Sequence, residues 1–270
     1  WCPMRSKKSF EAGTEAVAQL LNVSKTIVVE TCQTHGRYES RNLFGRIWSQ
    51  CPACAEAERA TADANAETER RRARKQAWAE KLGRAALPER FLDRTLKNYR
   101  VECEGQALAL AFAEKYADEF DSVLAAGRCA IFHGNYGTGK THLSVAIALR
   151  IMHRDNRRVL FSTVRQAIRS ITETWNRNSK LTESQAIASL VEPDLLILDE
   201  VGVQFGNGTE VMIISDFMNE RYNAKKPTLL LSNLTLPQIR EYLGERAFER
   251  LRERGGQSVG FTWGSERGRL

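Results

Sequence analysis

One eight-residue stretch constrains the fold of this chain most, because its glycines and lysine have the spacing of a phosphate-binding loop. The stretch is Gly134-Asn135-Tyr136-Gly137-Thr138-Gly139-Lys140-Thr141, which matches G-x-x-x-x-G-K-[ST]. In such a loop the glycines let backbone N–H groups surround a polyphosphate, Lys140 reaches the β- and γ-phosphates, and Thr141 offers a hydroxyl to Mg²⁺. The apolar residues 129–133 predict a buried strand before the loop, and residues 142–150 predict a helix after it. This order favours a nucleotide site over a chance glycine-rich turn.

Further apolar stretches after the loop predict an α/β fold with a parallel sheet. The stretches are residues 158–162, 195–198, 228–232 and 257–263, and helical patterns separate them. Apolar strands without alternation are typical of a parallel sheet that helices cover on both faces. Gly83 and Pro88 interrupt the chain before this part, so we expect a domain boundary near residue 88.

Polar residues follow two of these predicted strands, at the edge where open α/β sheets bind their ligands. Asp199 and Glu200 follow residues 195–198, and Asn233 follows residues 228–232. Asp199 would help to hold Mg²⁺ with Thr141, and Glu200 would polarise the attacking water as general base. Asn233 would face the γ-phosphate or that water. The alternatives are an acidic turn after a strand and an asparagine that caps the next helix.

Four residues near the N-terminal end have the spacing of a structural zinc site. They form a C-x-x-H pair, Cys32 and His35, and a C-x-x-C pair, Cys51 and Cys54, and each pair is expected to present its two ligands from a tight turn, or knuckle. Three thiolates and one imidazole make a tetrahedral set that suits structural rather than catalytic Zn²⁺. The interval between the pairs predicts short strands and turns, as in a zinc ribbon, and so small a module often needs its metal to fold. The alternatives are unrelated cysteines in loops, or Cys2 as a ligand in place of His35.

A charged segment connects the two parts. Residues 55–84 are rich in Ala, Glu and Arg and predict a solvated helix, within which Arg70-Arg71-Arg72-Ala73-Arg74-Lys75 is a dense basic run. This run is either a solvated helix face or a contact for phosphates or for an acidic partner. The net charge of +7 permits nucleic-acid binding without establishing it.

The composition narrows the class of protein further. Hydrophobic residues at 42% and charged residues at 27% are ordinary for a globular protein, and no apolar run is long enough to cross a membrane. The first residues lack the apolar core of a signal peptide. We therefore expect a cytoplasmic protein whose six cysteines are not joined in a disulfide framework.

Residues 244–254 predict a helix with alternating charges, which usually form a solvated face. Phosphoryl transfer needs positive charge at the γ-phosphate, however, and an arginine of a neighbouring subunit can supply it. The residue types alone leave four candidates for that arginine, which are Arg246, Arg250, Arg252 and Arg254.

From Phe91 to Arg267 the chain resembles the ATPase domain of the DnaC-type replicative helicase loaders, which are AAA+ proteins related to the DnaA initiator. The resemblance depends on residues 134–143, 195–200, 232–234, 243–252, 261–263 and 265–267. Residues 94–106 are similar to the corresponding segment of phage and prophage members, and phage-type members also look similar at the Cys/His pairs.

This resemblance assigns roles that the spacing leaves open. It implies that Arg250 is the trans-acting arginine finger, Arg267 the sensor-2 arginine and Asn233 sensor 1. It also implies that Tyr99 flanks the adenine and that no helical lid follows the AAA+ domain. Glu266 stands where many members carry an aromatic residue.

We therefore expect an N-terminal zinc-binding, helicase-interaction domain with a charged helical linker at residues 1–88 and an AAA+ ATPase domain at residues 89–270. The resemblance implies an ATPase that uses ATP and Mg²⁺ to load a DnaB-type hexameric helicase onto single-stranded DNA. It also implies self-association through the ATPase domains and no membrane contact. One alternative is a transposase-partner ATPase of the insertion-sequence kind, against which the zinc module and residues 94–106 argue. The other is a nucleotide-gated DNA-binding adaptor that is not an enzyme.

Overall fold

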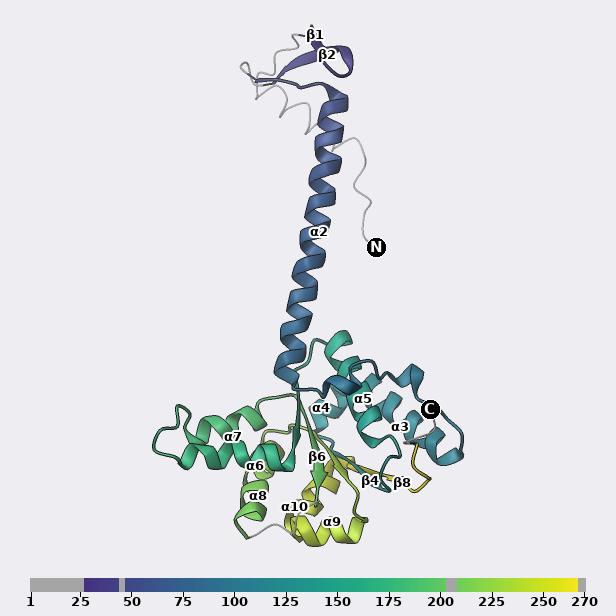
Figure 1. The fold of residues 1–270 in the computed structure, drawn as a ribbon, viewed down its shortest axis with the longest axis vertical. Coiled ribbons are helices and arrows are strands. Elements are labelled where there is room, and N and C mark those ends of the chain that lie inside the picture. The colour runs from purple at the N-terminus through teal and green to yellow at the C-terminus, as the bar shows by residue number, and fades with distance from the viewer. Residues whose placement is uncertain (1–26, 44–46, 203–207, 267–270) are drawn as a thin grey trace, which may run out of the picture. The chain divides into compact units, whose positions relative to one another are not determined.

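The computed structural model describes residues 27–43, 47–202 and 208–266 of the 270-residue chain (Figure 1). The chain divides into two compact units, residues 1–78 and residues 79–270. The helix α2, Pro52–Ala85, contains the point at which they divide. The expected domain boundary near residue 88 stays a prediction. No helix in the described part of the chain is both long and apolar enough to cross a membrane.

The first unit contains a small antiparallel sheet with the order β1-β2-β3. Its strands are β1, Ile27–Cys32, β2, Gly36–Leu43, and β3, Ile47–Trp48. Cys32 pairs with Gly36 at the turn of the β1–β2 hairpin, where Gly36 has a φ of 78°. Apolar side chains of the sheet face solvent, with Val29 65% and Ile47 61% exposed. The described sheet therefore lacks the buried apolar face that ordinarily stabilises a β-sheet.

The helix α2 continues from this sheet and agrees with the solvated helix expected at residues 55–84. Every residue from 56 to 77 is exposed, and this stretch contains no large apolar side chain. Such a helix lacks the apolar stripe by which most helices pack on a core.

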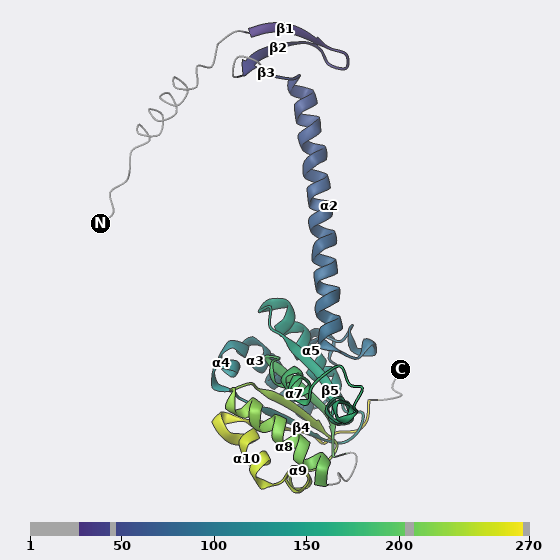
Figure 2. The same ribbon diagram turned by 90° about the vertical axis from the view of Figure 1, so that its left-hand side faces the viewer.

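The second unit is built on a five-stranded sheet whose strands are all parallel, as the sequence predicted (Figure 2). The strands are β4, Ala130–Gly134, β5, Val159–Thr163, β6, Leu195–Val201, β7, Thr228–Ser232, and β8, Gln257–Phe261. Their order is β5-β6-β7-β4-β8, so β7 lies between the strand before the phosphate loop and the strand that carries the acidic pair. All five residues of β7 are buried, which explains why its central residues 229–231 are all leucine.

Eight helices of the described residues surround this sheet. They are α3, Glu104–Asp118, α4, Phe120–Ala126, α5, Lys140–Arg154, α6, Val164–Thr172, α7, Glu183–Val191, α8, Gly208–Asn223, α9, Leu236–Leu243, and α10, Glu245–Arg252. Short 3₁₀ helices lie at Glu89–Phe91, Leu96–Asn98, Glu173–Trp175 and Glu253–Gly255.

The helices bury apolar side chains against the strands. Phe132 of β4 meets the ring of Phe112 of α3 at 5.8 Å between centroids and that of Phe261 of β8 at 5.1 Å. The neighbouring Ile131 belongs instead to a cluster with side chains of α6, α7, α8, α9 and α10. Successive residues of β4 therefore contribute to different parts of the core, as expected for a strand buried on both faces.

Arg221 of α8 is a charged residue inside this core, only 1% exposed. Its guanidinium donates to the carbonyl oxygens of residues 190, 191, 193 and 227 and to the hydroxyl of Thr228, at 2.6–3.1 Å. Burial lowers its pKa to about 10. Because these acceptors lie at the end of α7, after it and at the start of β7, Arg221 ties α8 to both elements.

Candidate functional site

The phosphate loop joins β4 to α5 and has the backbone geometry that its glycines permit. Gly134, Gly137 and Gly139 have φ angles of 118°, 74° and 93°, in the left-handed region. A Cβ atom on Gly134 would lie 2.5 Å from the carbonyl oxygen of Phe261, and one on Gly139 would lie 2.8 Å from the ring of Tyr99. The strand, loop and helix predicted around this motif are therefore all present.

Lys140 is buried and turned onto the loop itself. Its ammonium group donates to the carbonyl oxygens of Gly134, at 2.9 Å, and Asn135, at 2.6 Å. The Thr138 hydroxyl donates to the same Asn135 carbonyl at 2.8 Å. These contacts hold the cation beside the glycine-rich turn, from which its flexible stem can reach an anion in the loop.

Thr141 and Asp199 come from different elements and meet across the site. The Thr141 hydroxyl, in the first turn of α5, donates to the Asp199 carboxylate of β6 at 3.2 Å. Burial raises the pKa of Asp199, although hydrogen bonds from Glu200 and Thr141 oppose that shift. Two neighbouring oxygen donors of this kind fit Mg²⁺, which prefers hard oxygen ligands.

Glu200 directly follows Asp199 and is exposed. Its backbone N–H donates to the Asp199 carboxylate at 2.7 Å, and its φ is 61°, which is uncommon for a residue with a Cβ atom. The register between β6 and β7 is also irregular between Leu198 and Val201. The backbone of β6 therefore departs from regular strand geometry at Asp199 and Glu200.

Asn233 lies at the end of β7, the strand between β6 and β4. The preceding Ser232 is buried, and its hydroxyl donates to the carbonyl of Val201 at 2.6 Å, which holds the ends of β7 and β6 together. Because β4 leads into the phosphate loop, this strand order places Asn233 on the edge between the loop and the acidic pair.

Two aromatic side chains hold the loop from outside. The Tyr99 hydroxyl and the Trp263 indole N–H both donate to the carbonyl of Thr138, at 3.3 Å and 3.0 Å. The side-chain amide of Asn135 donates to the carbonyls of Thr262 and Trp263, at 3.0 Å and 3.2 Å. Burial raises the pKa of Tyr99, so its hydroxyl stays protonated and able to donate. Tyr99 was predicted to flank the adenine, which stays a prediction; the contact that the structure shows is with the phosphate loop.

Arg250 lies in α10, outside the loop contacts just described. Its guanidinium carbon is 5.0 Å from the centre of the Tyr222 ring, over which Arg254 also lies at 4.6 Å. The Tyr222 hydroxyl donates to the Glu253 carboxylate. Arg250 also lines a cavity of about 430 Å³ formed mainly by α8 and α10, and no described residue of the phosphate loop lines it. Arg267, the other predicted arginine, lies outside the described residues.

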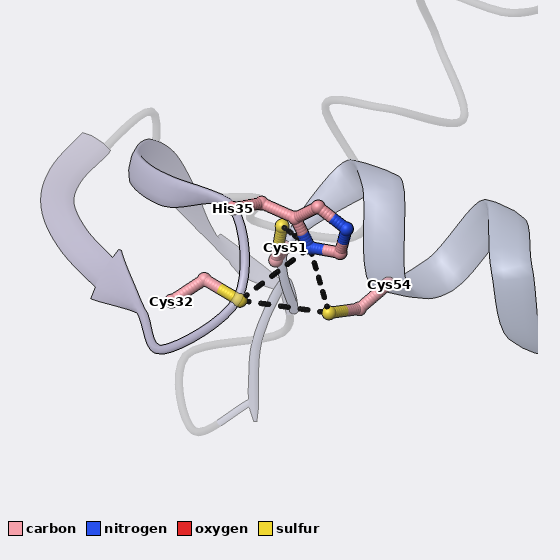
Figure 3. A group of neighbouring side chains, drawn as sticks. All are labelled: Cys32, His35, Cys51 and Cys54. Carbon is pink, nitrogen blue, oxygen red and sulfur yellow. Dashed lines mark hydrogen bonds between the residues drawn. The ribbon is translucent and has the colours of Figure 1, made fainter.

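The four predicted zinc ligands lie together in the first unit (Figure 3). Their ligand atoms are all within 4.8 Å of one another. The imidazole Nδ1 of His35 is 3.3 Å from Cys54 Sγ, 3.6 Å from Cys32 Sγ and 3.7 Å from Cys51 Sγ. The sulfurs of Cys32 and Cys54 are 3.5 Å apart. Ligands around a tetrahedral Zn²⁺ are separated by about 3.3–3.8 Å, so this donor set fits the ion.

The second ligand pair differs from the sequence-based expectation. The C-x-x-C spacing predicted a tight turn, whereas Pro52 begins α2 and Cys54 belongs to its first turn. Hydrogen bonds from the backbone of Thr34 and His35 lower the pKa of Cys32 to about 6, and the Cys32 hydrogen bond raises the pKa of Cys54 to about 11. The first turn of α2, and not a second tight turn, therefore places Cys54 beside Cys32 and His35 of the β1–β2 hairpin.

Comparison with known proteins places this chain among nucleotide-binding proteins. The model of the family described as IstB-like ATP binding protein matches residues 67–250. The chain belongs to this IstB-like family. It is 39% identical to the replicative helicase loader DnaC of Escherichia coli strain K12 over 176 residues. These residues cover 65% of this chain and 70% of that protein. It is 34% identical over 187 residues to DnaC of Buchnera aphidicola subsp. Schizaphis graminum, and these residues cover 69% of this chain and 74% of that protein.

Solved structures show the fold of this IstB-like protein. A crystal structure of the DnaC helicase loader matches with a TM-score of 0.58 at 22% identity, covering 64% of this chain and 99% of that one. A crystal structure of DnaI matches with a TM-score of 0.55 at 22% identity, covering 67% and 95%. A structure of AMPPCP-bound DnaA from Aquifex aeolicus matches with a TM-score of 0.53 at 23% identity, covering 65% of this chain and 51% of that one. The second unit therefore has the AAA+ fold of ATP-binding proteins.

The residues matched by the IstB-like model include most of the predicted nucleotide-site residues but none of the predicted zinc ligands. The phosphate loop, the acidic pair, Asn233 and Arg250 all lie within residues 67–250, whereas the four Cys/His residues precede them. Sequence reasoning missed the contact of Trp263 with the phosphate loop. Trp263 follows a strand that ends in the buried Phe261, and an indole at such a position was the available signal. Sequence reasoning also missed Tyr222, which no local pattern distinguishes.

Proposed function

We propose that this protein is an ATP-dependent loader that places the replicative DNA helicase on single-stranded DNA during replication initiation. The observation that carries the proposal is the contact of Thr141 with Asp199 beside the phosphate loop. It occurs in the part of the chain that is similar to the DnaC loaders. A family member with this arrangement has the parts needed to bind ATP with a divalent cation.

The proposed chemistry is hydrolysis of the γ-phosphate of ATP. The phosphate loop, Gly134 to Thr141, would surround the phosphates with its N–H groups, and Lys140 would exchange its contacts with loop carbonyls for phosphate oxygens. Thr141 and Asp199 would hold Mg²⁺, which when bound neutralises phosphate charge. The exposed Glu200 would accept a proton from the attacking water, and Asn233 would orient that water.

We further propose that the protein self-associates, with Arg250 of one subunit at the nucleotide of the next. Arg250 lies away from the loop contacts of its own chain, and its stacking on Tyr222 gives the guanidinium a defined place. A positive charge brought in by a neighbour would couple hydrolysis to assembly. Arg267 is proposed as the sensor-2 arginine from the resemblance alone.

The N-terminal region, residues 1–88, is proposed to bind Zn²⁺ through Cys32, His35, Cys51 and Cys54 and to grip the helicase. The exposed apolar side chains of its small sheet, including Val29 and Ile47, suit contact with a protein. The Cys/His cluster precedes the residues matched by the IstB-like model, and this extra module favours a loader over a transposase-partner ATPase.

The test is loading of a purified DnaB-type helicase onto circular single-stranded DNA, which a closed hexameric ring cannot enter by itself. Unwinding of an annealed strand should require this protein and ATP. A Lys140→Ala variant should fail because it loses nucleotide binding, and Glu200→Gln should bind ATP but hydrolyse it at least a hundredfold more slowly. Capture of a transposase but no helicase, or full loading by Glu200→Gln, would support one of the alternatives instead.

A further inference from the structure

The basic run of α2 has a geometry that the ATPase fold does not explain. Its five cations lie between residues 70 and 75, in the stretch of α2 where every side chain is exposed. At about 100° per residue, Arg70, Arg74, Arg71 and Lys75 occupy one side of the helix. We call these four residues the cationic face.

Arg72 lies off this face and is the member of the run that has an ion pair in the described structure, with Glu69 at 3.1 Å. No ion pair joins a described carboxylate to any residue of the cationic face, although Glu67 lies three and four positions before Arg70 and Arg71. The charges of the face are therefore exposed to solvent and available to an external anion.

The arrangement is unfavourable for the helix itself. Arg70 with Arg74, and Arg71 with Lys75, are like-charged pairs four residues apart, and such pairs destabilise a helix. The helix dipole does not compensate, because its effect is confined to the last turn, whereas Lys75 is ten residues before the final residue, Ala85 (85 − 75). Burial gives no compensation either, because the face is exposed.

We propose that the cationic face of α2 binds the phosphate backbone of single-stranded DNA. The inference deepens the proposed function, on which it rests for the identity of the nucleic acid. It assigns the contact to the helix between the metal module and the ATPase sheet. Arginine suits this partner because its guanidinium can donate two hydrogen bonds to one phosphate.

The composition of α2 favours a phosphate backbone over an acidic protein. Stable protein interfaces have a core of apolar or aromatic side chains within a polar rim. Residues 56–77 contain no large apolar side chain, so a protein partner would find only rim-like charges there. Backbone binding to nucleic acid needs no apolar core, because the release of counterions from the phosphates drives it.

The opposite side of α2 favours a single strand over a duplex. Glu69 and Glu80 lie on that side, together with Gln76. A helix inserted in the major groove meets phosphates on both walls, and these carboxylates would be repelled there. A flexible single strand can follow the cationic face and avoid Glu69 and Glu80, and the carboxylate nearest in sequence on the side of that face is Glu67.

The experiment compares two triple variants that remove the same charge from the same helix. The test variant is Arg70→Gln, Arg71→Gln and Arg74→Gln, and the control is Arg59→Gln, Arg72→Gln and Arg84→Gln. Glutamine keeps a good helix propensity, and circular dichroism checks the helix content. The probe is a fluorescein-labelled 30-nucleotide oligothymidylate, titrated at several salt concentrations without ATP or helicase.

Loss of three phosphate contacts should reduce the slope of log K against log [salt] by about 2 in magnitude, with weaker binding at low salt. The control should keep the slope of the unaltered protein. A variant with Arg70→Lys, Arg71→Lys and Arg74→Lys should restore most of the slope, which a folding defect in the glutamine variant would not mimic. Equal slopes in the test and control variants would overturn the proposal, as would a loss confined to a duplex of the same length.

The outcome is separable from that of the proposed function. ATP binding belongs to the second unit and not to the cationic face, so the test variant should retain it, and helicase capture is measured separately on the unaltered protein. An unchanged salt slope together with intact helicase loading rejects only the α2 contact. If the test variant has the reduced slope and the unaltered protein captures no helicase, only the proposed loader function is rejected.

Discussion

The two units of this protein are stabilised in different ways. In the second unit, the proposed ATPase unit, the strands β4, β6 and β7 are mostly buried, and even a buried guanidinium, that of Arg221, has five hydrogen-bond acceptors. In the first unit the described strands expose Val29 and Ile47, and four side chains that could hold a metal ion lie within 4.8 Å of one another. A core of apolar side chains specifies the first kind of fold, whereas four side chains and an ion can specify the second.

The largest expected effect is removal of zinc. Cys51→Ser, or a strong chelator, should release one Zn²⁺ per chain and unfold the sheet β1-β2-β3, because structural Zn²⁺ contributes about 10 kcal/mol or more to such modules. The ATPase unit should keep its unfolding temperature and its ATP affinity. Elemental analysis, circular dichroism and calorimetry measure these effects. Cys103→Ser, at an exposed cysteine outside the cluster, is the matched control. Protein that is free of zinc yet folded in the first unit would contradict the comparison.

The next effect separates activity from stability in the ATPase unit. Arg250→Ala should lower DNA- or helicase-stimulated ATP hydrolysis by about 10³-fold or more, as loss of an arginine finger does. Its unfolding temperature should change little, because Arg250 is only partly buried and contacts one ring. Glu249→Ala is the control, since Glu249 is exposed on the same helix and is not a candidate for the finger.

Mixing tests whether Arg250 acts in trans. Arg250→Ala subunits and Lys140→Ala subunits should regain activity together, because an intact composite site can form between them. If the mixture assembles and stays inactive, Arg250 is not the finger, and Arg246 or Arg252 becomes the next candidate.

Sequence reasoning succeeded where the backbone itself limits the residues. The three left-handed glycines of the phosphate loop and the fully buried stretch Leu195–Leu198 leave a direct pattern in the sequence, and both have the expected structure. The C-x-x-C pair was less predictable, because the same spacing fits a turn or the first turn of a helix. The site residues themselves stay predictions until such variants are measured.

Contacts between distant residues were not predictable in the same way. Trp263 and Thr138 are 125 positions apart, and an indole after a strand that ends in a buried residue indicates a hydrogen bond without identifying Thr138 as its acceptor. Arg221 likewise lies in a helix whose sequence does not distinguish a buried arginine from a solvated one. Such interactions depend on how the strands are ordered, which local patterns do not determine.

A third prediction concerns this buried arginine. Arg221→Met keeps much of the side-chain volume but leaves the carbonyls around residues 190–193 and 227 without their donor. We expect destabilisation of the ATPase unit by about 3 kcal/mol, which lowers its unfolding temperature by roughly 6–12 °C. Zinc content should not change. Arg169→Met, at an exposed position of α6, should stay within about 0.5 kcal/mol. Equal effects of the two substitutions would show that the hydrogen bonds of Arg221 add nothing to the fold.

The smallest expected effect tests whether metal binding and folding are one process in the first unit. Gly36 has a φ of 78° with open space around it, so Gly36→Ala costs backbone strain without a clash. The strain is about 1 kcal/mol. If the hairpin folds only with its ion, this cost should appear as roughly fivefold weaker Zn²⁺ affinity in a competition titration. Gly83→Ala, in the last turns of α2 and also in open space, should leave Zn²⁺ affinity unchanged. Unchanged affinity for both variants would mean that the hairpin is folded before the metal binds.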